Sequence, residues 1–370
     1  MFSDGVKVTL CLTGIELFCA HFIDYCLCRK NCEMEVHMNG IRFYKPYEAP
    51  FEIFGLYGDV EKNGYCRLPR DVAEATSADV ARLSKHTSGG RVRFKTDSEK
   101  IVLKIKGNYY STWHTTPMMR RGADLYIDKP RGAVFVGAIK PNGEFESSAE
   151  IVMPSGEHDV TVFLPLFGEV ESLEIGICEG ALLSAHTPYT HNLPVVFYGS
   201  SITQGACASR PGRAYEAMIS RKYDLNYIGL GFSGACRAEK AIVEYMATLE
   251  MSAFVSDYDH NAPTREHLAA THHYLYETIR QKHPKIPYFM VTRPNFYYNE
   301  DCIGRRDIIM RSYLDAREAG DKNVYFIDGS AFWSGQAVSD LTLDMTHPND
   351  EGFRRMADYI GDVMAKVMGL

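Results

Sequence analysis

From residue 195 to the C-terminus, short apolar runs alternate with longer segments of helical periodicity, and this alternation limits the possible folds more than any other feature of the chain. Strands that are separated by helices pair in parallel, and helices then cover both faces of the sheet. The expected strands are residues 195–198, 225–230, 253–256, 287–292 and 324–328, and the expected helices are residues 213–222, 237–249, 264–282, 303–319 and 350 onward. We therefore expect an α/β domain with a parallel sheet.

The first of these strands runs directly into Gly199, Ser200 and Ser201. Open α/β sheets bind their ligands at the carboxyl edge of the strands. A serine at that edge is a candidate nucleophile, although serines also cap helices and form turns. Its position makes Ser201 a candidate, and the assignment also needs a base for its hydroxyl elsewhere in the chain.

A carboxylate and an imidazole lie three residues apart near the C-terminus, at Asp344 and His347. Within one turn of chain this spacing places both side chains on the same side. A histidine that is oriented by a carboxylate can take the proton from a serine hydroxyl. The alternative is a polar turn that caps the last helix. Together with Ser201, the pair favours nucleophilic catalysis.

The chain resembles the SGNH (GDSL-type) hydrolases, whose four motif blocks occur here in the same order. These blocks are Gly199-Ser200-Ser201-Ile202-Thr203, Gly231-Phe232-Ser233-Gly234, Asp259-His260-Asn261 and Asp344-Met345-Thr346-His347-Pro348. The resemblance covers about the last half of the chain and implies a three-layer α/β/α, flavodoxin-like fold. It also departs from the family pattern, because Ser200 replaces the usual Asp before the nucleophile and Asp-His-Asn-Ala-Pro replaces the usual Gly-x-Asn-Asp block.

The same resemblance implies a role for each matching residue. Ser201 is the expected nucleophile, and His347 and Asp344 are the expected base and its orienting carboxylate. The expected oxyanion donors are Gly234, the side-chain amide of Asn261 and the backbone N–H of Ser201. A turn glycine and an Asx-turn asparagine are the alternatives for Gly234 and Asn261.

Between residue 41 and about residue 179, short runs of strand type are separated by turn residues. The expected strands are residues 91–96, 101–106, 125–127, 133–137, 160–164 and 170–175. This spacing predicts an antiparallel, jelly-roll-like β-sandwich. Gly122-Ala123-Asp124-Leu125-Tyr126 resembles the Gly-x-Asp-Leu-Tyr signature of a β domain that precedes some SGNH hydrolases. With a small, polar stretch at residues 184–188, we expect a β-sandwich domain over 1–187 and a catalytic domain over 188–370.

Aromatic residues of the β half suggest a platform for a sugar ring, since ring faces stack on the C–H groups of sugars. The candidates are Trp113, His114 and the Tyr109-Tyr110 pair. The alternative is that these side chains belong to the core of the sandwich.

Three further polar residues lie near the expected carboxyl edge of the parallel sheet. Arg210, Arg293 and His260 are candidate substrate contacts. A structural ion pair is the alternative for each arginine, and solvent exposure is the alternative for His260.

Composition excludes several other classes of function. The net charge of −7 disfavours nucleic acid as a partner, and the chain contains no apolar run of about 18 residues, which a membrane span needs. Ten cysteines without paired Cys-x-x-Cys units give little support for zinc, and we expect reduced thiols in a cytoplasmic protein. No metal or organic cofactor is expected, and a homo-oligomer is left open.

Within the expected β-sandwich domain, residues 1–33 are an extension that does not share the strand pattern of the rest. Their apolar stretch at residues 8–18 is interrupted by Glu16 and lacks a basic cluster before it, unlike a signal peptide. We expect either an extra strand or an extension upstream of a natural start at Met34 or Met38.

The sequence therefore predicts a serine esterase that removes acetyl or other short acyl groups from a carbohydrate. The polar loop at residues 204–209 and the absence of a long apolar lid-like segment favour a short acyl group on a polar alcohol, in a small-molecule or oligosaccharide ester. Acetylated sugar follows from the resemblance, because related two-domain members include carbohydrate acetylesterases. The alternatives are an acyltransferase with the same triad and a non-catalytic carbohydrate-binding protein.

Overall fold

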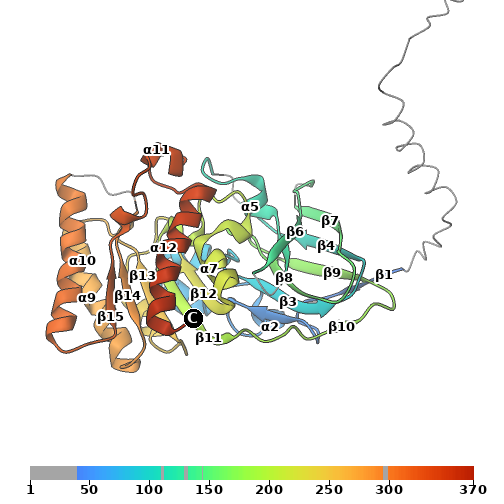
Figure 1. Ribbon diagram of the computed structural model, residues 1–370, viewed down its shortest axis with the longest axis horizontal. Coiled ribbons are helices and arrows are strands. Elements are labelled where there is room, and N and C mark those ends of the chain that lie inside the picture. The colour runs from blue at the N-terminus through green and yellow to red at the C-terminus, as the bar shows by residue number, and fades with distance from the viewer. Residues whose placement is uncertain (1–39, 110–111, 129–131, 144, 295–298) are drawn as a thin grey trace, which may run out of the picture. The chain divides into compact units, whose positions relative to one another are not determined.

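The computed structural model describes residues 40–109, 112–128, 132–143, 145–294 and 299–370, and it divides them into a β half followed by an α/β half (Figure 1). The expectation of an extra strand or an extension at residues 1–33 lies outside the described residues.

The β half consists of two antiparallel sheets. One has the strand order β1-β9-β4-β7, and the other has the order β10-β3-β8-β5-β6, with β2 paired to β3. The strands are β1 (Ile41–Tyr44), β2 (Glu52–Phe54), β3 (Arg91–Thr96), β4 (Lys100–Lys106), β5 (Asp124–Ile127), β6 (Val134–Ala138), β7 (Glu146–Val152), β8 (His158–Phe163), β9 (Ser172–Cys178) and β10 (Leu183–Ser184).

The core of the β half lies between these two sheets. Alternate residues of β4, namely Ile101, Leu103 and Ile105, are buried there, because successive side chains of a strand point to opposite faces. Val92 and Val162 of the other sheet belong to the same apolar cluster. The predicted antiparallel sandwich is confirmed.

The sequence interpretation assigned only strands to the β half, and in this it was wrong. Four short helices occur there, namely α2 (Val60–Asn63), α3 (Arg70–Thr76), α4 (Ala78–Leu83) and α5 (Pro117–Arg121). Ser77 ends α3 and also caps α4 by accepting a hydrogen bond from the Val80 N–H. Leu68, Val80 and Leu83 pack into the core of the α/β half. The spacing of these apolar residues therefore fits packing against the α/β half and not against the sandwich.

The α/β half contains a five-stranded parallel sheet with the order β12-β11-β13-β14-β15. The strands are β11 (His191–Gly199), β12 (Leu225–Gly231), β13 (Ala253–Asp257), β14 (Tyr288–Val291) and β15 (Val324–Ile327). The helices are α6 (Ser201–Gln204), α7 (Tyr215–Tyr223), α8 (Lys240–Met246), α9 (Arg265–Lys282), α10 (Glu300–Glu318), α11 (Val338–Leu341) and α12 (Asp350–Met368), with single 3₁₀ turns at Pro211–Arg213 and Gly329–Ala331.

Helices cover both faces of this sheet. Val195 and Phe197 of β11 pack in one apolar cluster with α7 and α12, while Val196 and Tyr198 pack in a second cluster with α8, α9 and α10. Neighbouring residues of one strand thus serve opposite cores, as expected for a sheet buried on both sides. The predicted three-layer α/β/α arrangement is confirmed.

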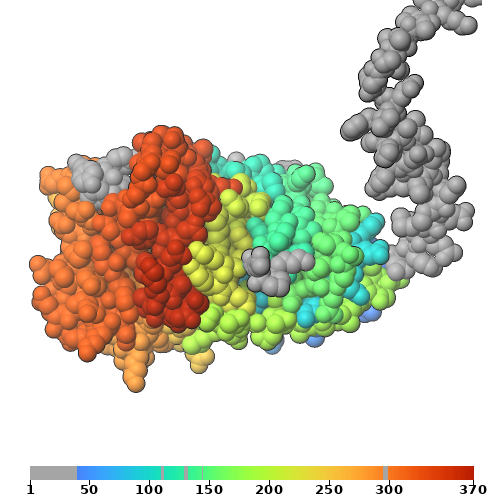
Figure 2. Space-filling model, viewed as in Figure 1, coloured from blue at the N-terminus to red at the C-terminus, as the bar shows by residue number. Residues whose placement is uncertain are grey.

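The two halves are joined through the Gly-x-Asp-Leu-Tyr segment. The carboxylate of Asp124, which is fully buried, accepts hydrogen bonds from Arg210 Nη1 at 2.7 Å and from the Gly212 N–H at 2.8 Å. The Tyr126 hydroxyl accepts another from Arg210 Nη1 at 2.6 Å. Figure 2 shows the α7 region of the α/β half in direct contact with the β half, and residues 41–370 pack as one unit.

Candidate active site

Ser201 lies in the turn from β11 to α6, at the point where the sheet ends. The Ser200 hydroxyl caps α6 by accepting a hydrogen bond from the Ile202 N–H at 3.2 Å. A Cβ atom at Gly199 would lie 2.0 Å from Thr203 Oγ1 and 2.5 Å from the Asp257 carbonyl oxygen, so only glycine fits there. This tight turn leads directly into Ser201, which is 7% exposed.

The structure brings Ser201, His347 and Asp344 together. Ser201 Oγ lies 2.9 Å from His347 Nε2, and His347 Nδ1 lies 2.7 Å from Asp344 Oδ2. With its Nδ1–H donated to the carboxylate, the histidine keeps a lone pair on Nε2 for the serine proton. This arrangement can activate a hydroxyl for attack on a carbonyl carbon.

The loop before α12 fixes the carboxylate of this group. Asp344 Oδ1 accepts hydrogen bonds from the backbone N–H groups of Thr346 at 3.0 Å and of His347 at 2.6 Å, and Met345, between Asp344 and Thr346, has a φ of +67°. Burial disfavours the ionised form of Asp344, but the hydrogen bonds from His347 outweigh it and lower its pKa overall. The spacing of three residues therefore acts through a turn rather than a helix.

Ser201, Gly234 and Asn261 each follow the C-terminal end of a strand. Those strands, β11, β12 and β13, are neighbours in the sheet, and Gly199 is in register with Gly231 and Asp257 at their ends. Gly234 has a φ of +73°, and a Cβ atom added to it would meet no other atom within 4 Å, so its backbone is open to a ligand. The three residues thus gather at one edge.

The side-chain amide of Asn261 is oriented by a backbone contact. Its Oδ1 accepts a hydrogen bond from the Cys236 N–H at 3.4 Å. Because this contact uses the oxygen, the Nδ2 donors are the part of the amide left for a ligand.

Arg293, which the sequence offered as a substrate contact, makes the structural ion pair that was its alternative. Its Nε donates to Asp259 Oδ2 at 3.1 Å, and its Nη2 donates to the Asp259 carbonyl oxygen at 3.1 Å. Arg305 Nη1 donates to the same carbonyl at 2.8 Å and to that of Ala262 at 2.9 Å. Both arginines therefore hold the loop that carries Asn261.

Arg210 is likewise committed to structure rather than to substrate. Besides its bonds to Asp124 and Tyr126, its guanidinium group lies 3.9 Å from the centre of the Phe135 ring. It serves the junction between the two halves.

His260 is half-buried, so the solvent-exposed alternative does not apply. Its buried Nε2 has no hydrogen-bond partner among the described residues. Burial lowers the pKa of His260 to about 4, which leaves a neutral ring beside Asn261 at pH 7.

Trp113 and His114 of the β half lie beside the triad. The His114 ring stacks on that of His347, with centroids 5.1 Å apart and planes at 6°, and the Trp113 ring lies 6.1 Å from His347 at 74°. Trp113 is 70% exposed, so it does not belong to the core. Tyr109 contacts Arg121 instead, and Tyr110 lies outside the described residues.

The sequence did not predict the contact of His114 with His347 or the contact of Gln204 with His86. These residues come from segments far apart in the chain, and no motif or spacing links them. The only signal in the sequence was a glutamine three residues after the candidate nucleophile, at Gln204.

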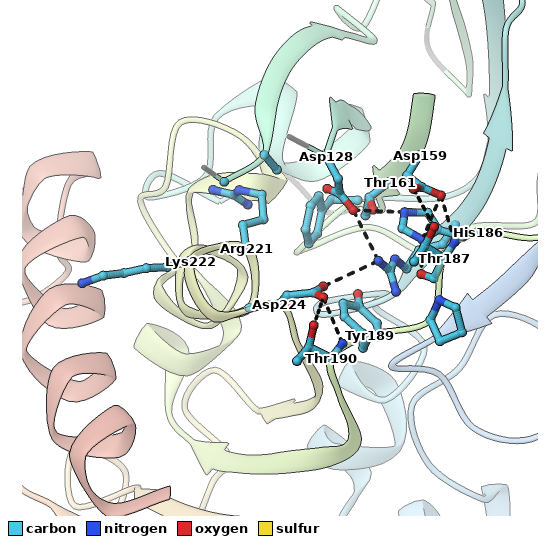
Figure 3. A pocket seen from close by; sticks show the side chains of 16 residues that line it. Asp128, Asp159, Thr161, His186, Thr187, Tyr189, Thr190, Arg221, Lys222 and Asp224 are labelled. Carbon is cyan, nitrogen blue, oxygen red and sulfur yellow. Dashed lines mark hydrogen bonds and ion pairs between the residues drawn. The ribbon is translucent and has the colours of Figure 1, made fainter. Parts of the chain in front are cut away.

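A separate cavity of about 330 Å³ lies at the opposite edge of the sheet (Figure 3). Asp224 and Thr190, which line it, precede β12 and β11, whereas Ser201 follows β11. Arg93 bridges its two sides, at 3.3 Å from Asp128 and 3.8 Å from Asp224. This cavity is walled by contacts between the two halves and contains no triad residue.

The described residues hold no group of three or more histidine, cysteine, aspartate or glutamate side chains placed to bind a metal ion. Among the same residues, no helix combines the length and apolar character that crossing a membrane requires.

Comparison with known families and structures shows the family of the chain. The GDSL-like lipase/acylhydrolase family matches residues 192–365, and the family of N-terminal regions of SGNH-hydrolase-type esterases, which carries the Gly-x-Asp-Leu-Tyr signature, matches residues 41–183. A protein from Bacteroides ovatus described as a GDSL-like lipase is 30% identical, with 89% of this chain and 98% of that chain covered and a TM-score of 0.80. The chain belongs to the GDSL/SGNH esterase family.

More distant structures share the two-part fold of this SGNH esterase. A salicylyl-acyltransferase from a tetracycline biosynthetic pathway is 20% identical, with 88% of this chain and 97% of that chain covered and a TM-score of 0.73. An acetyl xylan esterase from the rumen bacterium Butyrivibrio proteoclasticus is 12% identical, with 89% and 99% covered and a TM-score of 0.58. At these identities the likeness concerns the fold alone. No functionally curated protein matches the sequence.

Proposed function

We propose that this SGNH esterase removes acetyl or similarly short acyl groups from a carbohydrate through an acyl-serine intermediate. The observation that carries the proposal is the continuous hydrogen-bonded chain from Ser201 Oγ to His347 at 2.9 Å and from His347 to Asp344 at 2.7 Å. Such a chain lets a neutral imidazole act as base while the carboxylate stabilises the imidazolium that forms.

In the first half of the reaction, Ser201 Oγ forms a bond to the ester carbonyl carbon while His347 Nε2 takes the hydroxyl proton. The carbonyl oxygen becomes an oxyanion that accepts hydrogen bonds from the N–H groups of Ser201 and Gly234 and from Asn261 Nδ2. Each such donor typically contributes about 10²–10³ in rate. When the carbon–oxygen bond to the alcohol breaks, His347 returns the proton to the leaving alkoxide. A water molecule, deprotonated in turn by His347, then attacks the acyl-serine; the bond from the acyl carbon to Ser201 Oγ breaks, His347 returns the proton to Ser201, and the acid is released.

Three observations support a sugar as the alcohol part of the substrate. Trp113 presents an exposed ring next to His347, and an indole face stacks well on the C–H groups of a pyranose. The net charge of −7 suits a neutral substrate better than a polyanion. The shared fold with an acetyl xylan esterase fits the same substrate class.

Transfer of the acyl group to an alcohol instead of water is the second candidate, favoured by the shared fold with an acyltransferase. Both reactions proceed through the same acyl-serine, so they differ only in the acceptor.

The test is incubation with a panel of acetylated oligosaccharides, followed by mass spectrometry of sugars and released acid. We expect loss of acetyl groups and formation of acetate. Retention of every acetyl group alongside hydrolysis of a simple aryl acetate would refute the sugar assignment, and acetyl transfer to an added sugar would establish the acyltransferase. If an active-site acylating reagent does not react with Ser201, the esterase is refuted and the non-catalytic carbohydrate-binding protein is the remaining alternative.

A further inference from the structure

The side chain of Gln204 connects the turn that carries Gly234 to the β half of the molecule. Gln204 follows Ser201 by three residues in α6 and is fully buried. Its Oε1 accepts a hydrogen bond from the Ser233 N–H at 2.9 Å. Because Ser233 directly precedes Gly234, this bond fixes the peptide next to the candidate oxyanion donor.

The other end of the same amide is held by the sandwich. Gln204 Nε2 donates to the Leu166 carbonyl oxygen at 3.1 Å and lies 3.0 Å from His86 Nδ1. Burial lowers the pKa of His86 to about 3, so the ring is neutral and its Nδ1 is available as an acceptor. A flipped amide would set its NH₂ group against the Ser233 N–H and its oxygen against the Leu166 carbonyl. The orientation of Gln204 is therefore determined by its partners.

The strand that leads into this turn is held from the same side. Arg67, which is 2% exposed, donates Nη1 to the carbonyl oxygens of Gly229 at 3.1 Å and Gly231 at 2.7 Å. Its Nε donates to the His86 carbonyl oxygen at 2.7 Å. The end of β12 and the turn after it are thus tied to the β half through buried polar contacts, which are costly to leave unpaired.

We propose that Gln204 is a positioning residue, which holds the Ser233-Gly234 turn at the height of Ser201 so that the Gly234 N–H meets the oxyanion. The inference rests on the proposed function, because it takes Gly234 as an oxyanion donor. The β half would then have a second role besides binding substrate. Through Leu166 and His86 it holds Gln204, and Gln204 in turn positions the Gly234 N–H of the α/β half. An oxyanion donor must be in place before charge develops, and a displacement of about 1 Å can cost on the order of 10²-fold in rate.

Two variants of Gln204 test its side-chain hydrogen bonds. Gln204→Leu removes both the bond to the Ser233 N–H and the bonds to Leu166 and His86. Gln204→Glu keeps an acceptor for the Ser233 N–H but sets an oxygen against the Leu166 carbonyl, unless the carboxyl is protonated. Ser88→Ala is the matched control, because the Ser88 hydroxyl donates to the Gln204 carbonyl oxygen at 3.0 Å without touching the amide or Ser233. His86→Asn is the conservative variant, since an amide oxygen replaces the Nδ1 acceptor.

The measurement is kcat and KM for a chromogenic acetate over a range of pH, with thermal unfolding to establish that each variant is folded. We expect kcat to fall by about 10²-fold in Gln204→Leu, with KM within threefold of wild type. Ser88→Ala should stay within threefold in kcat, and His86→Asn, which keeps an acceptor for Gln204 Nε2, should lose less kcat than Gln204→Leu. The ratio of kcat in Gln204→Glu to that of wild type should rise as the pH falls, because a protonated carboxyl again donates to Leu166.

Either of two results would overturn the inference: a folded Gln204→Leu with kcat within threefold of wild type, or a loss in Gln204→Leu that Ser88→Ala reproduces. If Gln204→Leu does not fold, the pH dependence of Gln204→Glu decides alone. Failure of the proposed function is distinguishable from both, because Ser201→Ala would then keep the activity of wild type.

Discussion

Replacing Asp344 by asparagine tests the hydrogen-bonding logic of the triad. Asp344 Oδ1 accepts from the backbone N–H groups of Thr346 and His347, and Oδ2 faces His347 Nδ1. In Asp344→Asn the amide oxygen must stay with the two N–H groups, because the reverse orientation would set NH₂ against both of them. Each N–H group left unpaired costs about 1–3 kcal/mol, so the reverse orientation costs at least about 2 kcal/mol. At that cost, roughly 1 molecule in 30 would hold the asparagine in the reverse orientation.

The NH₂ group of the asparagine therefore faces His347 Nδ1 and forces that nitrogen to accept. The ring proton then sits on Nε2, which points at Ser201 Oγ and can no longer take its proton. The loss of the carboxylate charge also removes stabilisation from the imidazolium. We expect kcat for a chromogenic acetate to fall roughly 10³–10⁴-fold, which is about 4 to 5.4 kcal/mol, with KM little changed.

The assay is steady-state kinetics on protein whose thermal unfolding matches wild type. Asp340→Asn is the control, since this exposed aspartate lies four residues earlier and its carboxylate bonds only to the Ser339 hydroxyl among the described contacts. A kcat of Asp344→Asn within tenfold of wild type would refute the proposed tautomer control.

Three further changes test other parts of the account. Trp113→Ala should raise KM for an acetylated oligosaccharide about tenfold, the equivalent of one aromatic contact of about 1.4 kcal/mol, and leave a small aryl acetate unaffected; equal effects on both would contradict a sugar platform. Asp124→Ala removes the buried carboxylate partner of the half-buried Arg210 and should lower the free energy of unfolding by about 3 kcal/mol in denaturant titrations, whereas a loss below about 1 kcal/mol would contradict the junction. Burial, and then the charge of Asp259, raise the pKa of Asp257, so folded Asp257 keeps its proton to a higher pH than the unfolded residue does. The free energy of unfolding of wild type therefore falls as the pH rises towards the folded pKa, by up to about 1.4 kcal/mol per pH unit. The stability of Asp257→Asn relative to wild type should be greater at pH 7 than at pH 4, and the same stability difference at both pH values would contradict this.

Sequence patterns predicted the five strands and the five longer helices of the α/β half, because the strands are largely buried and these helices bury apolar residues, whereas the four-residue helices α6 and α11 were not predicted. Residues 264–282, for example, were expected as a helix and form α9 (Arg265–Lys282). The motif order also placed Ser201, His347 and Asp344 as candidates, since short-range spacing and strand ends are readable from the chain.

What could not be predicted depends on contacts between distant segments. Arg210 and Arg293 follow strand-edge positions suited to substrate, yet their partners, Asp124 and Asp259, become visible only in three dimensions. The helices α3 and α4 were missed because their apolar residues face the core of the other half. Gln204 meets His86 across 118 positions of sequence, a pairing that no local pattern encodes.

The most direct test of the central claim is the turnover of a chromogenic acetate by Ser201→Ala beside wild type, with both proteins shown to be folded. We expect the variant to lose at least about 10³-fold in kcat, because no other hydroxyl among the described residues takes the place of Ser201 Oγ at 2.9 Å from His347 Nε2. Turnover by Ser201→Ala at the wild-type rate would contradict the account.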